Sequence, residues 1–369
     1  MSLKKEIDAR RAHIKTDAYS TSVGELISMY KEGELDIHPE FQRFFRWSQL
    51  QKSRFIESLL LGIPIPSIFV AQRDDGVWDV VDGLQRISTV LELVGELKDE
   101  DGKEKPRLLL CGTKYLPSLE GKQWEDGAQA LDREQQLLIK RSKFDVKIVL
   151  RESDESSKYE LFQRLNTGGS ALSDQELRNC IVIMADKEFF AWMRSLSVES
   201  NFIDCASLSD RAMDEQYDLE LVVRFLVFRR IAVDSLSTRA LRDLGSFLND
   251  AVVDCARSRA FSRKQEALVF RGTFALLAAS LGEDAFRRFD HSKKRFAGPF
   301  LISGFEAVAL GVGHNIDAWK KQKDVAPTLR ERVQKLWKQT EFLDGIGSGV
   351  AASDRLPATV AFGRKFFEP

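Results

Sequence analysis

Cysteine and histidine are scarce in this chain of 369 residues, which contains four of each. They stand at Cys111, Cys180, Cys205, Cys255, His13, His38, His291 and His314. No two cysteines form a C-x-x-C pair, and no histidine has metal-ligand spacing to another histidine or to a cysteine. The sequence therefore argues against a zinc site, a disulfide framework or a His-Asn-His nuclease, and it fits a cytoplasmic protein.

A charge of one sign and long apolar runs are also lacking. The 55 Lys and Arg residues nearly balance 56 Asp and Glu residues, so no dominant basic field marks the whole chain as a nucleic-acid binder, although a local patch remains open. No run of 18 uncharged apolar residues occurs, and residues 1–8 are mostly polar. We therefore expect neither a membrane span nor a signal peptide.

The clearest positive signal lies in residues 68–97. Two apolar runs, residues 68–71 and 77–81, flank Arg73-Asp74-Asp75-Gly76, and an Asp-Gly step between such runs predicts a β-hairpin. After residue 81, apolar residues recur every three or four positions, which is the spacing of one helix face. Residues 82–85 are therefore expected to form a tight corner between a buried strand and a helix.

This corner has the residue types of a phosphate site. A helix start leaves backbone N–H groups free where the dipole favours an anion. Gly83 lets a ligand approach the backbone, and Arg86 adds a planar donor fork that matches phosphate. Asp82 is expected to cap the helix or to hold a cation that accompanies phosphates. The alternative is that Asp82-Gly83 is only a turn and Arg86 a surface residue.

Residues 35–47 are rich in polar donors and aromatics, and Pro39 disfavours a regular helix or central strand there. Gln42 and Arg43 can hydrogen-bond a phosphate, a sugar or a carboxylate. Phe44, Phe45 and Trp47 can stack on a base, or they fill a core, which is the commoner role of aromatic clusters. Arg43 needs a partner because it is a charge among aromatics.

A second polar segment follows a predicted helix at residues 157–165. Asn166-Thr167-Gly168-Gly169 stops that helix, and Ser173 with Glu176 has the form of a capping box for the next one. The segment is either a loop with helix caps or a second polar rim, in which Arg164, Asn166 and Thr167 reach the same ligand.

From residue 186 onward the pattern predicts helices, at 187–196, 214–232, 237–257, 264–281, 299–311 and 325–341. No β-hairpin signal appears in this half. The basic residues between 287 and 295 favour a solvated connector over a nucleic-acid contact. Residues 351–369 are expected to dock loosely.

These motifs together resemble the N-terminal domain family of GmrSD-type, modification-dependent restriction proteins. The motifs occur in order over residues 20–180 as Pro39-x-Phe41-Gln42-Arg43-x-x-x-Trp47, Ile63-Pro64-Ile65-Pro66, Asp82-Gly83-Leu84-Gln85-Arg86-x-x-Thr89 and Phe162-x-Arg164-Leu165-Asn166-Thr167-Gly168-Gly169-x-x-Leu172-Ser173 with Glu176-Leu177-Arg178. The resemblance implies a ParB/sulfiredoxin-like fold. It also implies binding and hydrolysis of a nucleotide at the Asp-Gly-Gln-Gln-Arg motif.

Carried over residue by residue, the resemblance assigns the catalytic corner to Asp82, Gln85 and Arg86. It assigns nucleotide binding to Gln42, Arg43, Trp47, Gly83, Arg164, Asn166 and Thr167. Two departures matter. Leu84 stands where the family usually has Gln, which removes one polar contact, and the His-Asn-His nuclease domain of DNA-cleaving members has no counterpart here. DNA cleavage by this chain alone is therefore in doubt.

The sequence as a whole predicts an α+β fold, with a small mixed β-sheet domain in residues 18–180 and a helical domain in residues 181–369. The first functional hypothesis is a protein of a bacterial restriction or anti-phage system that binds a nucleoside triphosphate with Mg²⁺, with or without hydrolysing it. Asp82 or Glu40 is then the carboxylate that holds the metal or orients a water molecule. The alternatives are a regulatory module that binds DNA or a partner without catalysis, and a ParB-like nuclease. A separate nuclease subunit and a homo-oligomer are further expected partners.

Overall fold

The computed structural model describes residues 3, 15–37, 47–99, 101–125, 127–151, 153, 174–347 and 349–369. The chain divides into two compact units, Met1–Ala171 and Leu172–Pro369. The first unit combines a sheet with helices and the second is mostly helical, which confirms the predicted α+β fold. Each unit is described by itself.

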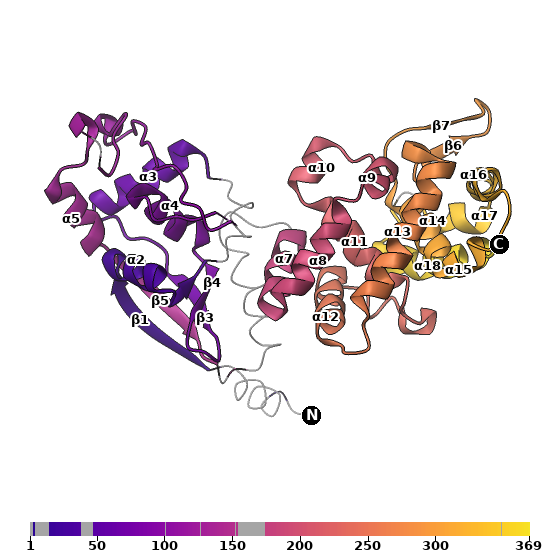
Figure 1. Cartoon of the computed structure of the whole chain (residues 1–369), viewed down its shortest axis with the longest axis horizontal. Coiled ribbons are helices and arrows are strands. Elements are labelled where there is room, and N and C mark those ends of the chain that lie inside the picture. Colours follow the sequence, from indigo (N-terminus) through magenta and orange to yellow (C-terminus); the bar gives the residue numbers. More distant parts are fainter. Residues whose placement is uncertain are drawn as a thin grey trace. The chain divides into compact units, whose positions relative to one another are not determined.

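The first unit is built on a mixed sheet of five strands (Figure 1). The strands are β1 Thr16–Ser22, β2 Leu35–Asp36, β3 Ile68–Gln72, β4 Trp78–Asp82 and β5 Lys143–Val149. Their order in the sheet is β1-β5-β3-β4-β2. The β1/β5 and β3/β4 pairs are antiparallel, and the β3/β5 and β2/β4 pairs are parallel. The predicted hairpin at Asp75-Gly76 is therefore confirmed as the β3–β4 connection.

One face of this sheet is buried under helices. In β5, Phe144, Val146 and Ile148 are buried, whereas the alternating residues Lys143, Asp145 and Lys147 are exposed. This pattern is expected for a strand that has one face in the core and the other exposed to solvent. The covering helices are α2 Val23–Glu32, α3 Gln49–Leu60, α4 Leu84–Val94 and α5 Arg133–Arg141. Their apolar residues and those of the strands form one core, and Figure 1 shows the helices gathered on one side of the sheet.

Local sequence signals fix where these helices begin and end. Ser22 caps α2 by accepting a hydrogen bond from the Glu25 N–H, and Gly33 ends that helix in the left-handed conformation with φ 77°. Ser48 and Gln51 form a reciprocal capping box at the start of α3. Serine is among the preferred N-cap residues, so both helix starts carry a signal that lies within the sequence itself.

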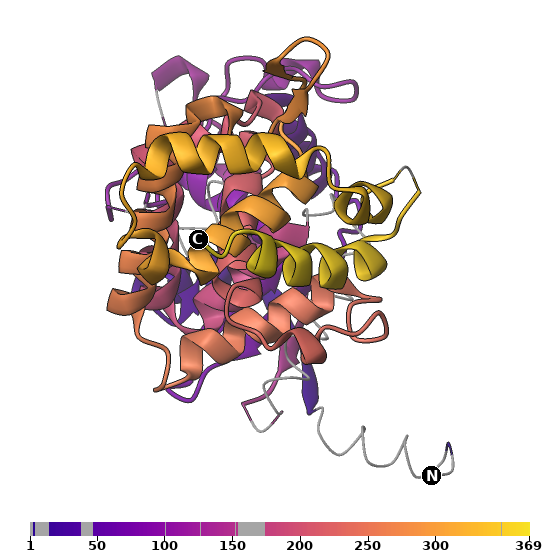
Figure 2. The same cartoon turned by 90° about the vertical axis from the view of Figure 1, so that its right-hand side faces the viewer.

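The second unit contains twelve α-helices and one short hairpin among its described residues. The helices are α7 Asp174–Ala185, α8 Lys187–Ser197, α9 Ser200–Ala206, α10 Asp210–Asp214, α11 Tyr217–Phe228, α12 Leu244–Arg257, α13 Arg263–Ser280, α14 Ile302–His314, α15 Ile316–Trp319, α16 Val325–Leu336, α17 Thr340–Gly345 and α18 Ala352–Phe366. Single 3-10 turns occur at Pro117–Leu119 and Gly127–Gln129 in the first unit and at Val233–Ser235 and Gly282–Asp284 in the second. In Figure 2 the yellow C-terminal helices face the viewer.

The C-terminal segment packs tightly, so the expectation of loose docking is wrong. Helix α18 lies against α14, where a Cβ on Gly363 would come within 2.5 Å of the Ala307 carbonyl oxygen. The Trp319 Nε1–H donates to the Phe367 carbonyl at 2.8 Å, and the Phe367 side chain is fully buried. Glycine at this position allows the two helix backbones to approach closely, as small residues do at tight helix crossings.

The second half also contains a β-hairpin that the sequence pattern does not predict. Strands β6 Arg288–Asp290 and β7 Arg295–Ala297 pair antiparallel, with Phe289 opposite Phe296. Three-residue strands carry too little alternation to be recognised, and the turn between them has none of the Asn-Gly or Asp-Gly steps that mark tight hairpins.

Candidate functional site

The predicted strand-to-helix corner is present in the first unit. Strand β4 ends at Asp82, Gly83 adopts the left-handed conformation with φ 98°, and α4 begins at Leu84. The Ile87 N–H donates to the Gly83 carbonyl and closes the first turn. The N–H groups of residues 84–86 therefore precede the first intrahelical bond, and they are the donors that a helix start offers to an anion.

Glycine is required at position 83 for two separate reasons. A positive φ is a conformation that residues with a Cβ adopt at a cost of roughly 1–2 kcal/mol. In addition, a Cβ at this position would overlap Ile68 Cγ2 of β3 and would lie 3.2 Å from Arg86 Nη2. The space beside Gly83 Cα on this side is thus filled by the protein itself, so close packing within the corner already accounts for this glycine.

Arg86 is buried, so it is not the surface residue of the alternative interpretation. Its Nη1 group donates to the carbonyl oxygens of Pro66 and Ser67, the latter at 3.1 Å, and its Nη2 group lies 3.1 Å from Asp82 Oδ2. Burial lowers the pKa of Arg86, and the neighbouring Asp82 carboxylate opposes that shift. Asp82 pairs with Arg86, and the N-cap position of α4 is Gly83, so the expectation that Asp82 caps the helix is wrong.

These contacts join two of the sequence motifs. The Ile63-Pro64-Ile65-Pro66 segment leads into β3, and its last carbonyl is held by a guanidinium from the first turn of α4. Proline has no N–H and cannot take part in a regular ladder as a donor, so the carbonyl groups of such a segment need donors from elsewhere. Pro66 and Ser67 are the partners that sequence reasoning missed, although the two prolines were a signal that this segment needs outside donors.

The corner retains features that suit a phosphate ester with a metal ion. The Asp82 side chain is 35% exposed, and only its Oδ2 atom is engaged by Arg86 among the contacts described. Protein sites for Mg²⁺–nucleotide complexes commonly supply one or two carboxylates, while phosphate oxygens and water complete the octahedron. Within the described ranges no group of three or more His, Cys, Asp or Glu could hold a metal ion. Asp82 therefore fits a metal that arrives with phosphates better than a metal held by the protein alone.

The structure brings Asp82, Gly83, Gln85 and Arg86 together at this corner. Gln85 is partly exposed, and its carbonyl accepts from the buried Thr89 hydroxyl at 2.6 Å. Trp47 lies against Phe55 of α3 with 5.6 Å between ring centroids and packs on the core of the unit, as in the core interpretation of the aromatics. The remaining predicted residues lie outside the described ranges. They are Glu40, Gln42, Arg43, Arg164, Asn166 and Thr167.

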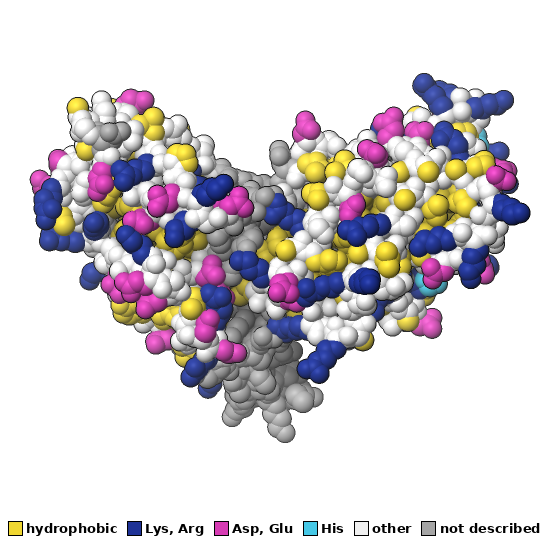
Figure 3. Space-filling model, viewed as in Figure 1, with side chains coloured by type: hydrophobic (Ala, Val, Ile, Leu, Met, Phe, Trp, Pro, Cys, Tyr) yellow, Lys and Arg dark blue, Asp and Glu magenta, His cyan; other side chains and the backbone are white. Residues whose placement is uncertain are grey.

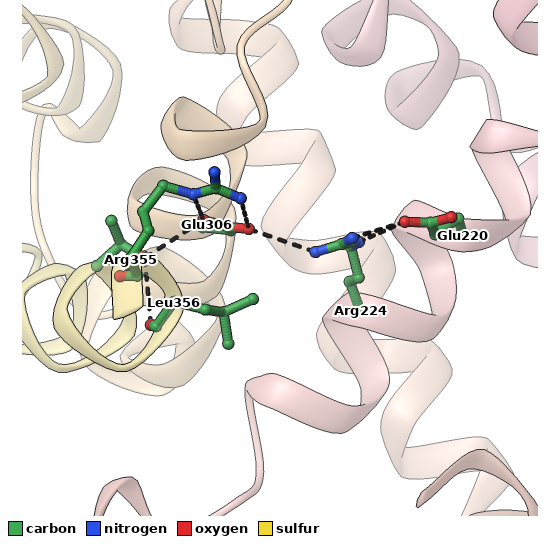
Figure 4. Close-up of polar contacts among 6 residues, drawn as sticks. Glu220, Arg224, Glu306, Arg355 and Leu356 are labelled. Carbon is green, nitrogen blue, oxygen red and sulfur yellow. Dashed lines mark hydrogen bonds and ion pairs between the residues drawn. The ribbon is translucent and has the colours of Figure 1, made fainter. Parts of the chain in front are cut away.

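A second cluster of charged residues lies inside the helical unit and was not foreseen from the sequence (Figure 4). Glu306 of α14 has no exposed surface, and it accepts from Arg355 Nε at 3.0 Å and Nη2 at 3.1 Å. Arg224 of α11 lies between Glu306, at 3.3 Å, and Glu220, at 2.7 Å. Burial raises the pKa of the adjacent Tyr217 to about 12. Each charge in this chain of contacts has an opposite charge beside it, so the cluster joins α11, α14 and α18 and needs no ligand.

The last family-like motif also lies in the helical unit. Arg178 of α7 is buried and donates from Nε to Asn249 of α12 at 3.0 Å, with a further bond from Nη1 to Gln175. Burial lowers the pKa of Arg178 to about 10. The Glu176-Leu177-Arg178 motif is therefore part of the packing between α7 and α12.

The fold and the corner define the first unit as an α+β domain with a tight glycine turn between a strand of its sheet and a helix. Comparison with family models gives the particular family: residues 23–183 match the GmrSD restriction endonuclease, N-terminal domain. That stretch of the chain belongs to this domain family. The match begins at the start of α2 and ends within α7, so it includes the corner and the Arg178 motif. No curated protein and no solved structure matches the chain.

The family indicates a member of a restriction or anti-phage system, with DNA and a nuclease as the suggested partners. The relation to ParB-like and sulfiredoxin-like folds stays a prediction. None of the helices in the described part of the chain is long and apolar enough to cross a membrane.

Proposed function

We propose that the domain in residues 23–183 binds a nucleoside triphosphate with Mg²⁺ and thereby regulates a restriction system. The observation that carries this proposal is the corner itself, in which uncapped helix N–H groups adjoin a partly exposed carboxylate at Asp82. Backbone donors at a helix start bind phosphate oxygens, and a single carboxylate completes a Mg²⁺ site on a polyphosphate. Membership of the GmrSD domain family and the implied role of its Asp-Gly-Gln-Gln-Arg motif support the same assignment.

In this proposal Arg86 is a positioning residue. Three of its five N–H donors are used by Pro66, Ser67 and Asp82, so its contribution is to hold the corner in shape and to keep Asp82 oriented. The side chains that neutralise the phosphates are then Arg43 and Arg164, as the family resemblance implies. Hydrolysis would follow if Gln85 or Asp82 orients a water molecule toward the terminal phosphate.

The test is the melting temperature of the full chain with each of the four nucleoside triphosphates, with and without Mg²⁺. A ligand at 1,000 times its Kd stabilises the folded state by about 4 kcal/mol. We expect one or more Mg²⁺–nucleotide complexes to raise the melting temperature of the native chain. Arg43→Ala and Arg164→Ala should abolish the rise, while Arg54→Ala, an exposed arginine of α3, should retain it.

Two outcomes would count against the proposal. If no nucleotide shifts the melting temperature, the domain is a DNA-binding or partner-binding module and not a nucleotide sensor. If the Arg54→Ala control loses the shift as fully as Arg43→Ala, the effect reflects general charge and not a site. Release of inorganic phosphate from the bound nucleotide would distinguish an enzyme from a binder. Arg86→Ala is unsuitable as the primary variant because it also removes internal hydrogen bonds.

A further inference from the structure

Positive charge is concentrated on the β6–β7 hairpin of the second unit, although the whole chain has a formal net charge of −1. The segment from 287 to 298 carries one acidic residue, Asp290, against five basic ones. They are Arg287, Arg288, Lys293, Lys294 and Arg295. In Figure 3 this hairpin is the dark blue projection at the upper right of the view, and Figure 1 shows β6 and β7 extending away from the helices of their unit.

The hairpin is held by contacts that fix its shape. Phe289 and Phe296 pair across the strands with 4.9 Å between ring centroids, and the Arg330 guanidinium of α16 lies 5.4 Å from the Phe296 ring. At the turn, Asp290 Oδ1 accepts from the N–H groups of Ser292 at 2.9 Å and Lys293 at 3.1 Å. The basic tip therefore stands on an ordered ribbon with an aromatic side and a turn closed by its own side chain.

Side chains alternate between the two faces of each strand, which separates the aromatic residues of the hairpin from its arginines. Phe289 and Phe296 share one face, so Arg288 and Arg295 are placed on the opposite face. Asp290 shares that face and lies directly across from Arg295. Both arginines are exposed, as are Lys293 and Lys294 in the turn. This face and the tip of the ribbon together carry four exposed cations and one carboxylate, that of Asp290.

Most of these cations are not neutralised by the protein. Within the residues that the structure describes, Arg288, Lys294 and Arg295 form no ion pair. Arg287 Nη2 pairs with Glu283 Oε2 at 3.0 Å, and Lys293 Nζ lies 3.9 Å from Asp290 Oδ2. Many arginines elsewhere in the unit are paired with carboxylates. The pairs include Arg211–Glu215, Arg224–Glu220, Arg229–Glu266, Arg263–Asp186, Arg271–Glu199, Arg330–Asp284 and Arg355–Glu306. The hairpin thus presents three cations without an ion pair in the described part of the chain, Arg288, Lys294 and Arg295, on a fixed scaffold.

We propose that this hairpin binds the phosphate backbone of double-stranded DNA. A two-stranded β-ribbon has the dimensions that the major groove admits, and Lys and Arg that replace counterions on phosphates supply sequence-independent affinity. The tip residues Ser292 to Arg295 are all polar, whereas segments that dock on anionic membranes add apolar or aromatic side chains that insert. The GmrSD family of the first unit also points to DNA as the polyanion. This site is independent of the proposed nucleotide corner and lies beyond residues 23–183.

The test compares two triple variants of the full chain that remove equal charge from the same unit. One carries Lys293→Gln, Lys294→Gln and Arg295→Gln. The control carries Lys320→Gln, Lys321→Gln and Lys323→Gln, which are three exposed lysines between α15 and α16. Binding of a fluorescent 25-base-pair duplex is measured by anisotropy over a series of salt concentrations without nucleotide, and the melting temperature of each variant confirms that it is folded.

We expect the native chain to bind the duplex with a steep salt dependence. The hairpin variant should bind at least tenfold more weakly, and its slope of log K against log salt should fall by about 2 to 3, since each phosphate contact contributes about 0.9. The control should bind as the native chain does. Equal losses in both variants, or no loss in the hairpin variant, would overturn the proposal. So would a hairpin variant that keeps DNA binding but loses binding to anionic vesicles or to an acidic protein.

Discussion

Two buried charge clusters in the described part of this protein differ in how completely the protein itself satisfies them. Around Glu306, two arginines and a second glutamate from three helices pair with one another, and the central carboxylate has no exposed surface. At the corner of the first unit, Arg86 is also buried, but its partner Asp82 is 35% exposed and the N–H groups of the following turn lack a side-chain cap. In a closed cluster, such as that around Glu306, every charge is paired within the protein and the cluster stabilises the fold. The corner at Arg86 is only partly closed, so it leaves polar groups available for a ligand.

The largest expected effect is in the closed cluster. Glu306→Ala leaves Arg224 and Arg355 as buried cations that have lost a shared partner, and breaking a buried pair in this way costs about 3–5 kcal/mol. Denaturant unfolding of the full chain should show that loss in the transition of the helical unit. Glu331→Ala, in an exposed pair with Lys335 on α16, is the control and should leave the transition unchanged. A small effect of Glu306→Ala would mean that the cluster is not closed as described.

A smaller but still clear effect is expected at the corner. Arg86→Ala removes the donors to Pro66 and Ser67 and leaves their carbonyl groups unpaired, which should destabilise the first unit by about 3 kcal/mol, because hydrogen bonds to charged groups contribute about 1.5–3 kcal/mol each. Arg86→Lys keeps the charge and one of the contacts, so it should lose only about half as much stability as Arg86→Ala. The exposed Arg54→Ala should change stability by less than about 0.5 kcal/mol. If Arg86→Ala proves as mild as Arg54→Ala, Arg86 does not brace the corner.

The smallest expected effect is the difference in stability between two alanine substitutions, at Gly76 and at Gly83. Gly76 and Gly83 both have positive φ, but a Cβ on Gly76 would meet nothing within 4 Å, whereas one on Gly83 would overlap Ile68. Gly76→Ala should therefore cost only the left-handed backbone, about 1 kcal/mol. Gly83→Ala should cost about 2 kcal/mol more, because overpacking adds to the backbone term. If urea unfolding gives the same loss of stability for Gly76→Ala and Gly83→Ala, then β3 moves at Ile68 to make room for the added Cβ. The corner would then be less tightly packed than its geometry indicates.

Local sequence signals predicted the parts of the first unit that depend on neighbours in the chain. The Asp75-Gly76 hairpin, the caps at Ser22 and Ser48 and the corner at Gly83 each rest on residues within a few positions of one another. Strand β1 was missed because its residues 16–20 are all exposed, so it lacks alternating burial, and it is defined by pairing with β5 more than 100 residues away.

The distinction between local signals and long-range contacts also explains which features of the site could be predicted. That Arg86 would stand at the corner follows from the helix start, but its use of the Pro66 and Ser67 carbonyls depends on how β3 lies beside α4, which no short motif states. The Glu306 cluster draws on α11, α14 and α18 and has no local signature either. Charged residues can thus be found from sequence, whereas the partners that decide their role come from tertiary packing.

Hydrogen exchange at the start of α4 tests most directly whether the open half of the corner binds a nucleotide. Exchange of the amides of Leu84, Gln85 and Arg86 should be measured with and without saturating Mg²⁺–nucleotide. The start of α3, where Ser48 and Gln51 already form a capping box, serves as the internal reference. If the nucleotide binds at this corner, exchange should slow at residues 84–86 and should not change at residues 49–51. Nucleotide that binds without slowing exchange at residues 84–86 would show that it binds elsewhere.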